Sequence, residues 1–220
     1  MTHHTAHLGR LCRSLLTVTL LASAWSAHAV LQPRDHNLDT VTDGYYDTVL
    51  DLTWWADANA AAGASQDDGF ITNDGYMSWQ NANNWVANFK PFGIGGWRLP
   101  SIDVSSSCNG YGCDSTASEL GHMYHGNLGG TPNSGVGGAP FTGLVPGQYW
   151  AGQLNLLDLD QAVTFDFSDG YQDADFKAEP VGAVWAVARG DVLAVPEPGS
   201  IALSAVGVLT LLGWARARRR

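Results

Sequence analysis

The sequence has little positive charge outside its two ends. The 220 residues hold 11 Lys and Arg against 21 Asp and Glu. Between residues 30 and 195 the cations are Arg34, Lys90, Arg98, Lys177 and Arg189. The 20 Asp and Glu residues of the same stretch leave it with a net charge of −15. A surface of that sign repels a phosphate backbone, so nucleic acid is excluded as a partner.

Long apolar runs are absent except at the two ends. Two arginines precede a short apolar run over residues 15–25, and the small-residue pattern of Ala27 and Ala29 follows it. This order is that of a secretory signal peptide over residues 1–29, which signal peptidase cleaves after Ala29. A retained N-terminal anchor is the alternative, and the short apolar run disfavours it.

The other apolar run lies near the C-terminus. It covers residues 201–215 and, extended back to residue 199, predicts a membrane-spanning helix over about 199–215. As a helix, residues 201–215 would span ~22 Å, less than a bilayer crossing needs. The residues before the run are Val195, Pro196, Glu197 and Pro198. The basic residues after it, which stay on the cytoplasmic side, are Arg216, Arg218, Arg219 and Arg220.

The order of these three features over residues 195–220 resembles the PEP-CTERM sorting signal. The resemblance implies an exosortase as partner, which cuts at the Val-Pro-Glu-Pro motif. It therefore implies an exported protein of the cell envelope or extracellular space, held in the membrane transiently or stably by its C-terminal segment. A simple C-terminal anchor that is never cut is the alternative.

Cysteine is scarce as well. The exported part of the chain has only Cys108 and Cys113, which flank four residues that include two glycines. An oxidising compartment favours a disulfide between the two thiols. A free or metal-binding pair is the alternative, although one CxxxxC pair without a second pair matches zinc sites poorly.

The residues between the two signals, 30–194, are enough for one domain with a core of its own. Alternation and β-branched content predict strands over residues 45–55, 148–154, 162–167 and 182–188. Apolar residues at helical spacing after Ser78 predict a helix that ends at Phe89. A capping box of Thr116 and Glu119 predicts a second helix. The fold class is therefore α+β, with two early helices and an antiparallel sheet.

Six segments of this domain follow a pattern known from other exported proteins: YDTVLDLTWWADAN, SWQNANNWVANF, GGWRLPS, CDSTASELGHMYHGNL, YWAGQL and AVWAVARGDV. Together these segments resemble the Lcl C-terminal domain family, a bacterial exported module. They lie within residues 43–193, and GGWRLPS is the most specific of them. The resemblance implies a C-type lectin-like fold with two helices and a twisted antiparallel sheet.

Tryptophan is abundant in the domain, and its ring faces stack on sugars. Trp54 and Trp55 are adjacent on a predicted strand, so their side chains face opposite sides of it. One of the two is therefore the better candidate for contact with a ligand, whereas most other tryptophans fall at inward positions. Arg98, inside GWRLP, is expected to form a structural ion pair with a carboxylate, and binding of an anionic ligand is the alternative.

Two groups of residues are candidate metal ligands. Six aspartates crowd the predicted strands late in the domain, and Asp166 and Asp169 are the calcium candidates among them. Solvated turns are the alternative interpretation of these aspartates. Glu119, His122 and His125 share the second predicted helix, but their i, i+3, i+6 spacing drifts around it, which favours a buried, hydrogen-bonded histidine. No cofactor is expected.

Recognised catalytic patterns are lacking. The chain has no GxSxG elbow, and none of its exported histidines lies in a known catalytic motif. Any two of twenty carboxylates could be chosen for glycoside cleavage, so their number carries no argument. We therefore expect no enzyme, but an exported surface or matrix protein that binds a polysaccharide or a surface protein. The alternatives are an enzyme acting on extracellular polysaccharide and a purely structural matrix protein.

Overall fold

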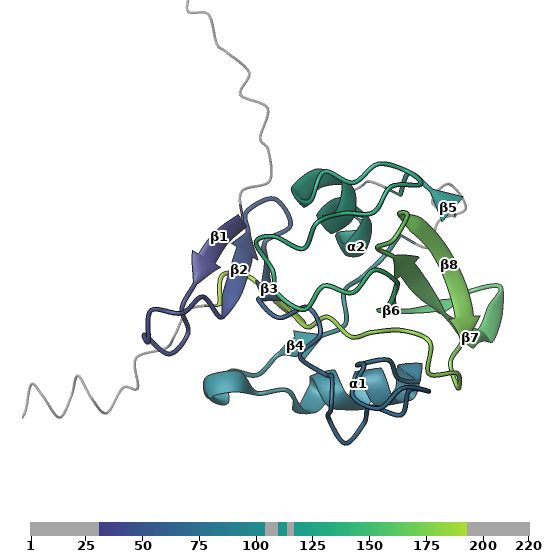
Figure 1. Ribbon diagram of the computed structural model, residues 1–220, viewed down its shortest axis with the longest axis horizontal. Coiled ribbons are helices and arrows are strands. Elements are labelled where there is room, and N and C mark those ends of the chain that lie inside the picture. The colour runs from purple at the N-terminus through teal and green to yellow at the C-terminus, as the bar shows by residue number, and fades with distance from the viewer. Residues whose placement is uncertain (1–30, 104–109, 114–116, 193–220) are drawn as a thin grey trace, which may run out of the picture.

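Two antiparallel sheets form the body of the protein (Figure 1). The computed structural model of the chain describes residues 31–103, 110–113 and 117–192. The first sheet has the order β1-β2-β3-β9-β4, which are Leu31–Arg34, Gly44–Asp47, Leu52–Trp55, Val187–Arg189 and Trp97–Arg98. The second has the order β5-β8-β7-β6, which are Gly110–Tyr111, Tyr171–Phe176, Asp158–Asp166 and Gln148–Asn155.

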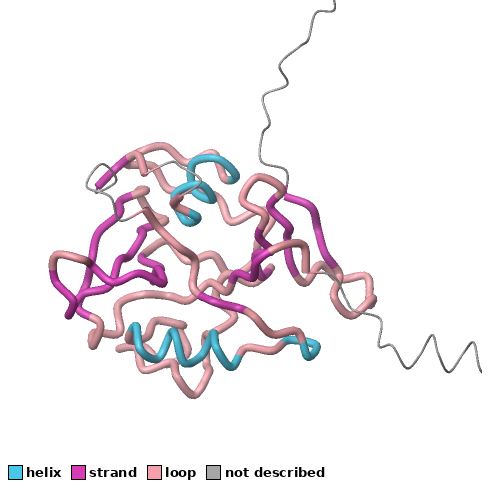
Figure 2. The backbone as a smooth tube through the Cα atoms, turned by 180° about the vertical axis from the view of Figure 1, so that it is seen from behind, coloured by secondary structure: helices cyan, strands magenta, loops and turns pink. Residues whose placement is uncertain are grey.

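Two helices lie on opposite sides of this body, α1 along the bottom of Figure 1 and α2 at its top. The view from behind in Figure 2 shows the same separation. Helix α1 covers Trp79–Asn88 and is followed by a 3₁₀ turn, η1, at Pro91–Gly93. Helix α2 covers only Glu119–His122 and runs directly into a π-helical turn, η2, at Met123–Asn127. The predicted α+β class is confirmed.

Helix α1 confirms the prediction made from its apolar spacing. It begins after Ser78, whose extended backbone (φ −63°, ψ 151°) is that of an N-cap, and Phe89 is its C-cap. The Ser78 hydroxyl bonds to Asp68 Oδ2 at 3.2 Å rather than to a helix amide. Ala82 and Trp85 are buried on the inward face, as expected from their spacing.

The predicted strand over residues 45–55 is wrong in one respect, because it is a hairpin. Strands β2 and β3 pair antiparallel, and a turn separates them at residues 48–51. The Asp47 carboxylate accepts hydrogen bonds from the amides of Val49 at 2.9 Å and Leu50 at 3.0 Å. An aspartate that binds its own backbone two or three residues on favours a turn over a continuous strand.

The predicted capping box of the second helix is also wrong. The N-cap is Ser118, whose hydroxyl accepts a hydrogen bond from the Gly121 amide at 3.3 Å. Glu119 is therefore the first helical residue and not the third, and its carboxylate turns away from the helix toward Arg98. Thr116 lies outside the described residues.

The segment before β9 joins the two sheets instead of forming the long strand predicted over residues 182–188. Ala183 donates its amide to the Gln148 carbonyl at 2.8 Å and accepts the Trp150 amide at 3.0 Å, so it lies along the edge of β6. Gly182 forms an isolated bridge with Met77 just before α1. Strands β1, β5 and β8 were not predicted.

Trp185 lies at the centre of the core. It is 0% exposed and makes edge-to-face contacts with Trp54 and Phe141, both at 4.8 Å between ring centroids. Its indole N–H donates to the Trp55 carbonyl at 2.9 Å. Packed rings with satisfied N–H groups hold β3 against the segment that leads into β9.

Among the described residues, no helix is long and apolar enough to cross a membrane. The predicted signal peptide, residues 1–29, and the predicted spanning segment, residues 199–215, both lie outside the described part of the chain.

We predict that Trp185→Ala lowers the free energy of unfolding by about 3–5 kcal/mol, because it removes a buried ring and leaves a cavity. The matched control is Phe176→Ala, since Phe176 is exposed on β8. Chemical denaturation measures both. Equal losses in the two variants would contradict a core centred on Trp185.

His36 supplies a test by pH. Its ring is buried against Trp55 and Trp97. Burial lowers the pKa of His36 below its ordinary value of 6.5, and the Asp43 carboxylate, 3.9 Å from Nδ1, opposes that shift without reversing it. As the pH falls below about 6.5, the unfolded chain therefore binds a proton at this residue more readily than the folded chain does.

We predict that stability decreases as the pH falls from 7 to 5, and that His36→Leu removes part of this dependence because leucine does not titrate. Thermal unfolding of the wild type and the variant across this range measures the difference between their slopes. Identical slopes would show that His36 does not contribute.

Candidate functional site

A polar pocket of ≈ 380 Å³ opens where the two sheets and both helices converge. Its lining consists of Asn83, Arg98, Leu99, Ser101, Glu119, Gly152, Gln153 and Arg189. These residues come from α1, β4 and the turn after it, α2, β6 and β9. Its volume lies within the range of roughly 300–1,000 Å³ that small-ligand sites occupy. We refer to it as the polar pocket.

An ion pair forms one wall of the polar pocket. Arg98 Nη1 and Nη2 donate to Glu119 Oε2 at 2.8 Å and Oε1 at 2.7 Å, a bidentate geometry. The Ser101 amide also donates to Glu119 Oε2, at 2.6 Å. The Glu119 side chain is 10% exposed and that of Arg98 is 38% exposed. The carboxylate is therefore fully engaged, while part of the guanidinium faces the opening.

Two amide side chains are held in fixed orientations beside this pair. Gln153 Oε1 accepts the Ile102 amide at 3.0 Å, so the Nε2 group of Gln153 remains as a donor. Asn83 Nδ2 donates to the Trp79 carbonyl at 2.8 Å, so the Oδ1 atom of Asn83 remains as an acceptor. The backbone N–H of Ile102 can only donate and the carbonyl of Trp79 can only accept. Exchanging the oxygen and nitrogen of either side-chain amide would therefore lose a hydrogen bond.

A β-bulge places Gln153 in the wall. The register between β6 and β7 shifts between Trp150 and Leu154, which includes Gly152 and Gln153. The Gly152 amide donates to the Pro100 carbonyl at 2.8 Å instead of to a residue of the neighbouring strand β7. Bulges of this kind often redirect a side chain beside a binding site.

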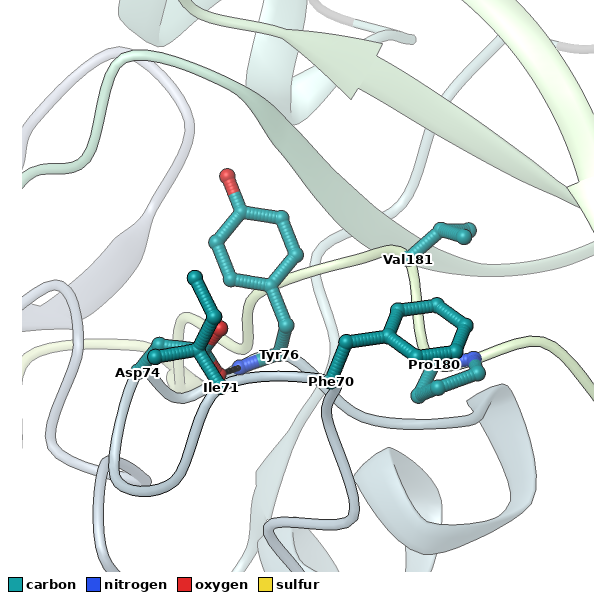
Figure 3. A pocket seen from close by; sticks show the side chains of 6 residues that line it. All are labelled: Phe70, Ile71, Asp74, Tyr76, Pro180 and Val181. Atoms are coloured by element: carbon teal, nitrogen blue, oxygen red, sulfur yellow. Dashed lines mark hydrogen bonds between the residues drawn. The ribbon is translucent and has the colours of Figure 1, made fainter.

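A second, apolar pocket of ≈ 510 Å³ lies on the long loop before α1 (Figure 3). It is lined by Phe70, Ile71, Asp74, Tyr76, Pro180 and Val181. Phe70 and Ile71 are 84% and 69% exposed, which is unusual for side chains of this size. Burial, and then the nearby carboxylates of Asp166 and Asp74, raise the pKa of Tyr76.

The structure corrects one of the two predicted ligand contacts. The side chains of Trp54 and Trp55 face opposite sides of β3, but Trp54 is 0% exposed and lies in the core. A ligand therefore has no access to it. Trp55 is half-buried and packs against Phe89 and Trp97, and it lines neither pocket.

The calcium candidates both stabilise turns. Asp166 Oδ1 accepts the Ser168 amide at 2.7 Å, and Asp169 Oδ1 accepts the Tyr171 amide at 2.9 Å. Asp169 Oδ2 also accepts the Tyr111 hydroxyl at 3.1 Å. These contacts suit the interpretation as solvated turns, and binding of calcium stays a prediction.

The other metal candidates have separate partners. Glu119 is held by Arg98, His125 Nδ1 lies 3.0 Å from the Gly130 carbonyl, and His122 Nε2 lies 3.9 Å from Asp47 Oδ2. In the described part of the chain, no group of three or more His, Cys, Asp or Glu side chains is arranged to hold a metal ion.

The remaining predicted residues are not tested by the geometry. Cys113 is buried, with Sγ 3.8 Å from the Gly110 carbonyl, but Cys108 lies outside the described residues, so the disulfide stays a prediction. The sorting motif at residues 195–198 and the basic residues after position 215 lie outside them too.

The sequence indicated only part of the polar pocket. Arg98 was expected to form an ion pair, and Glu119 is its partner. Asn83, Gln153 and Arg189 were missed. For Gln153 and Arg189 the available signal was a polar side chain within a mostly apolar segment, whereas Asn83 is one of several amides on α1, and the convergence of the three depends on tertiary packing.

Comparison with known proteins bears on the C-terminus. Residues 194–220 match the PEP-CTERM protein-sorting motif. No curated protein and no solved structure matches the chain. The motif confirms the predicted sorting signal, and it implies an exported, envelope-associated protein that an exosortase processes.

We predict that Glu119→Gln lowers the free energy of unfolding by about 1–3 kcal/mol, because a neutral amide leaves Arg98 without its counter-charge. Glu179→Gln is the matched control, since Glu179 is exposed and no ion pair among the described residues involves it. Denaturant titration of both variants measures the difference. An unchanged midpoint for Glu119→Gln would show that the pair does not hold β4 to α2.

Proposed function

We propose that this exported, exosortase-sorted protein is a non-catalytic binding module, and that the polar pocket is its saccharide site. The observation that carries the proposal is the convergence of Asn83, Gln153 and Arg98 from three different elements around one opening. Each of them keeps one hydrogen-bonding group directed to no other described residue. Fixed amides and a guanidinium are the groups that orient a ligand rich in hydroxyls.

The state of Glu119 supports a binding role over a catalytic one. Its two oxygens accept three hydrogen bonds, from Arg98 and from the Ser101 amide. A carboxylate whose two oxygens already accept these hydrogen bonds has little freedom to contact a reacting group. It serves instead to fix the orientation of Arg98.

The proposal includes the finer assignment of the fold. We propose that residues 43–193 form a domain of the Lcl C-terminal type with a C-type lectin-like arrangement. The support is the GGWRLPS segment, from which Arg98 reaches Glu119, together with two helices and antiparallel sheets in one body.

One further observation favours a protein ligand as the second candidate. Phe70 and Ile71 stand exposed beside the apolar pocket, where an apolar side chain of a surface protein would be sheltered from water. This candidate uses a different site, so variants separate it from saccharide binding.

We predict that the full-length protein, purified in detergent, binds saccharides on a glycan array, and that Asn83→Ala weakens this binding about three- to tenfold. The expected loss is that of one hydrogen bond from Asn83 Oδ1 to a ligand hydroxyl. Array titrations with calcium and with a chelator give the affinities and test the calcium prediction in the same experiment.

The matched control is Asn84→Ala, which removes the neighbouring amide from the exposed side of α1. Equal binding by the wild type and Asn83→Ala would exclude the polar pocket as the site. Failure of the wild type to bind any saccharide, together with capture of a surface protein that Phe70→Ser abolishes, would favour the second candidate. Release of reducing ends from a polysaccharide would instead show an enzyme.

A further inference from the structure

Positive charge is concentrated at the polar pocket. The described residues contain five Lys and Arg against 19 Asp and Glu. Two of those five cations, Arg98 and Arg189, line this single pocket. Glu119 is the only carboxylate in the lining, so the lining as a whole carries one net positive charge.

The uncompensated charge belongs to Arg189. Arg98 is neutralised by Glu119, whereas no ion pair among the described residues involves Arg189. Arg189 ends β9 and is exposed. Its guanidinium is therefore accessible, and it lies at the mouth of a site whose other charges cancel.

The carboxylates nearest to Arg189 in sequence or register already have other partners. Asp191 accepts two hydrogen bonds from Arg34, at 2.6 and 2.8 Å. Asp51, whose carbonyl accepts the amide of Gly190, receives the Tyr46 hydroxyl on Oδ1 at 2.8 Å. In so acidic a domain, these contacts leave Arg189 available to a carboxylate from outside.

The remaining groups of the pocket are mostly donors. Three hydrogen bonds to Leu99 and Glu119 use three of the five N–H groups of Arg98. Gln153 presents Nε2 because Oε1 is bound to the Ile102 amide. A site that is rich in hydrogen-bond donors and carries one net positive charge matches a ligand group that only accepts hydrogen bonds and carries one negative charge.

Resting on the saccharide function proposed above, we propose that the ligand of the polar pocket is an acidic sugar, whose carboxylate pairs with Arg189. The planar fork of an arginine matches the two oxygens of a carboxylate. The fixed donors of Gln153 and Arg98 and the acceptor of Asn83 then contact the ring oxygens and hydroxyls of the same sugar. Arg189 thus determines which saccharides are accepted.

The test uses the full-length protein in detergent and three probes measured by calorimetry. The probes are a galacturonic acid trimer, its neutral methyl ester, and a neutral trisaccharide that carries one sulfate. We expect the wild type to bind the acid at least about tenfold more tightly than the ester, the size of one charge-assisted contact. We expect Arg189→Gln to abolish this preference, so that the variant binds the acid no more tightly than the ester.

Two variants make the comparison specific. Lys90→Gln removes one positive charge from an exposed residue outside the pocket, and it should keep the full preference for the acid. Arg189→Lys keeps the positive charge but lacks the planar guanidinium, and it should retain only part of the preference for the acid over the ester. Melting temperatures equal to that of the wild type show that a variant is folded.

The outcomes separate this inference from the function on which it rests. Equal wild-type affinity for the acid and the ester would overturn the acidic-sugar assignment and leave the saccharide site intact. A preference that survives Arg189→Gln, or tighter binding of the sulfated probe, would overturn it as well. Binding of none of the probes, or of any array saccharide, would overturn the proposed function itself.

Discussion

The ion pair between Arg98 and Glu119 holds together parts of the chain that no strand pairing joins. It connects β4, at the edge of the first sheet, to the first residue of α2, and the Ser101 amide extends the connection to the turn after β4. Most of the Glu119 side chain is excluded from water, so each lost contact would leave a charge without compensation. The pair and the backbone hydrogen bond from the Glu119 amide to the Ser101 carbonyl, at 2.9 Å, together join α2 to the turn after β4 and form one wall of the polar pocket.

Behind this polar wall the core is rich in aromatic side chains. Trp150 and Trp185 are fully buried, and each directs its indole N–H to a backbone carbonyl, at Met77 and at Trp55. The Met77 carbonyl belongs to the segment just before α1 and the Trp55 carbonyl to the last residue of β3, so the rings join these to β6 and to the segment before β9. These large rigid side chains therefore bind the backbone of segments outside their own strands.

The described residues carry far more carboxylates than cations, so few of their side chains can bind an anion. Many of the described carboxylates accept backbone amides in turns, as at Asp47 and Asp166, and Asp191 pairs with Arg34. Three described cations form no ion pair, and of these Arg189 alone lines the polar pocket, beside a pair that is already neutral. The apolar pocket at Phe70 and Ile71 has a different chemistry and lies on a different loop, so the two pockets suit different ligands.

The sequence alone determined the sorting signal at the C-terminus, helix α1 and the α+β class, because these follow from local order, spacing and composition. It also indicated that Arg98 would pair with a carboxylate. Only the tertiary structure decided that Trp54 is inaccessible, that residues 45–55 turn back as a hairpin, and that Gln153 and Arg189 share a pocket. Those outcomes depend on side chains competing for backbone amides and on contacts between residues distant in sequence, and neither leaves a periodic pattern along the chain.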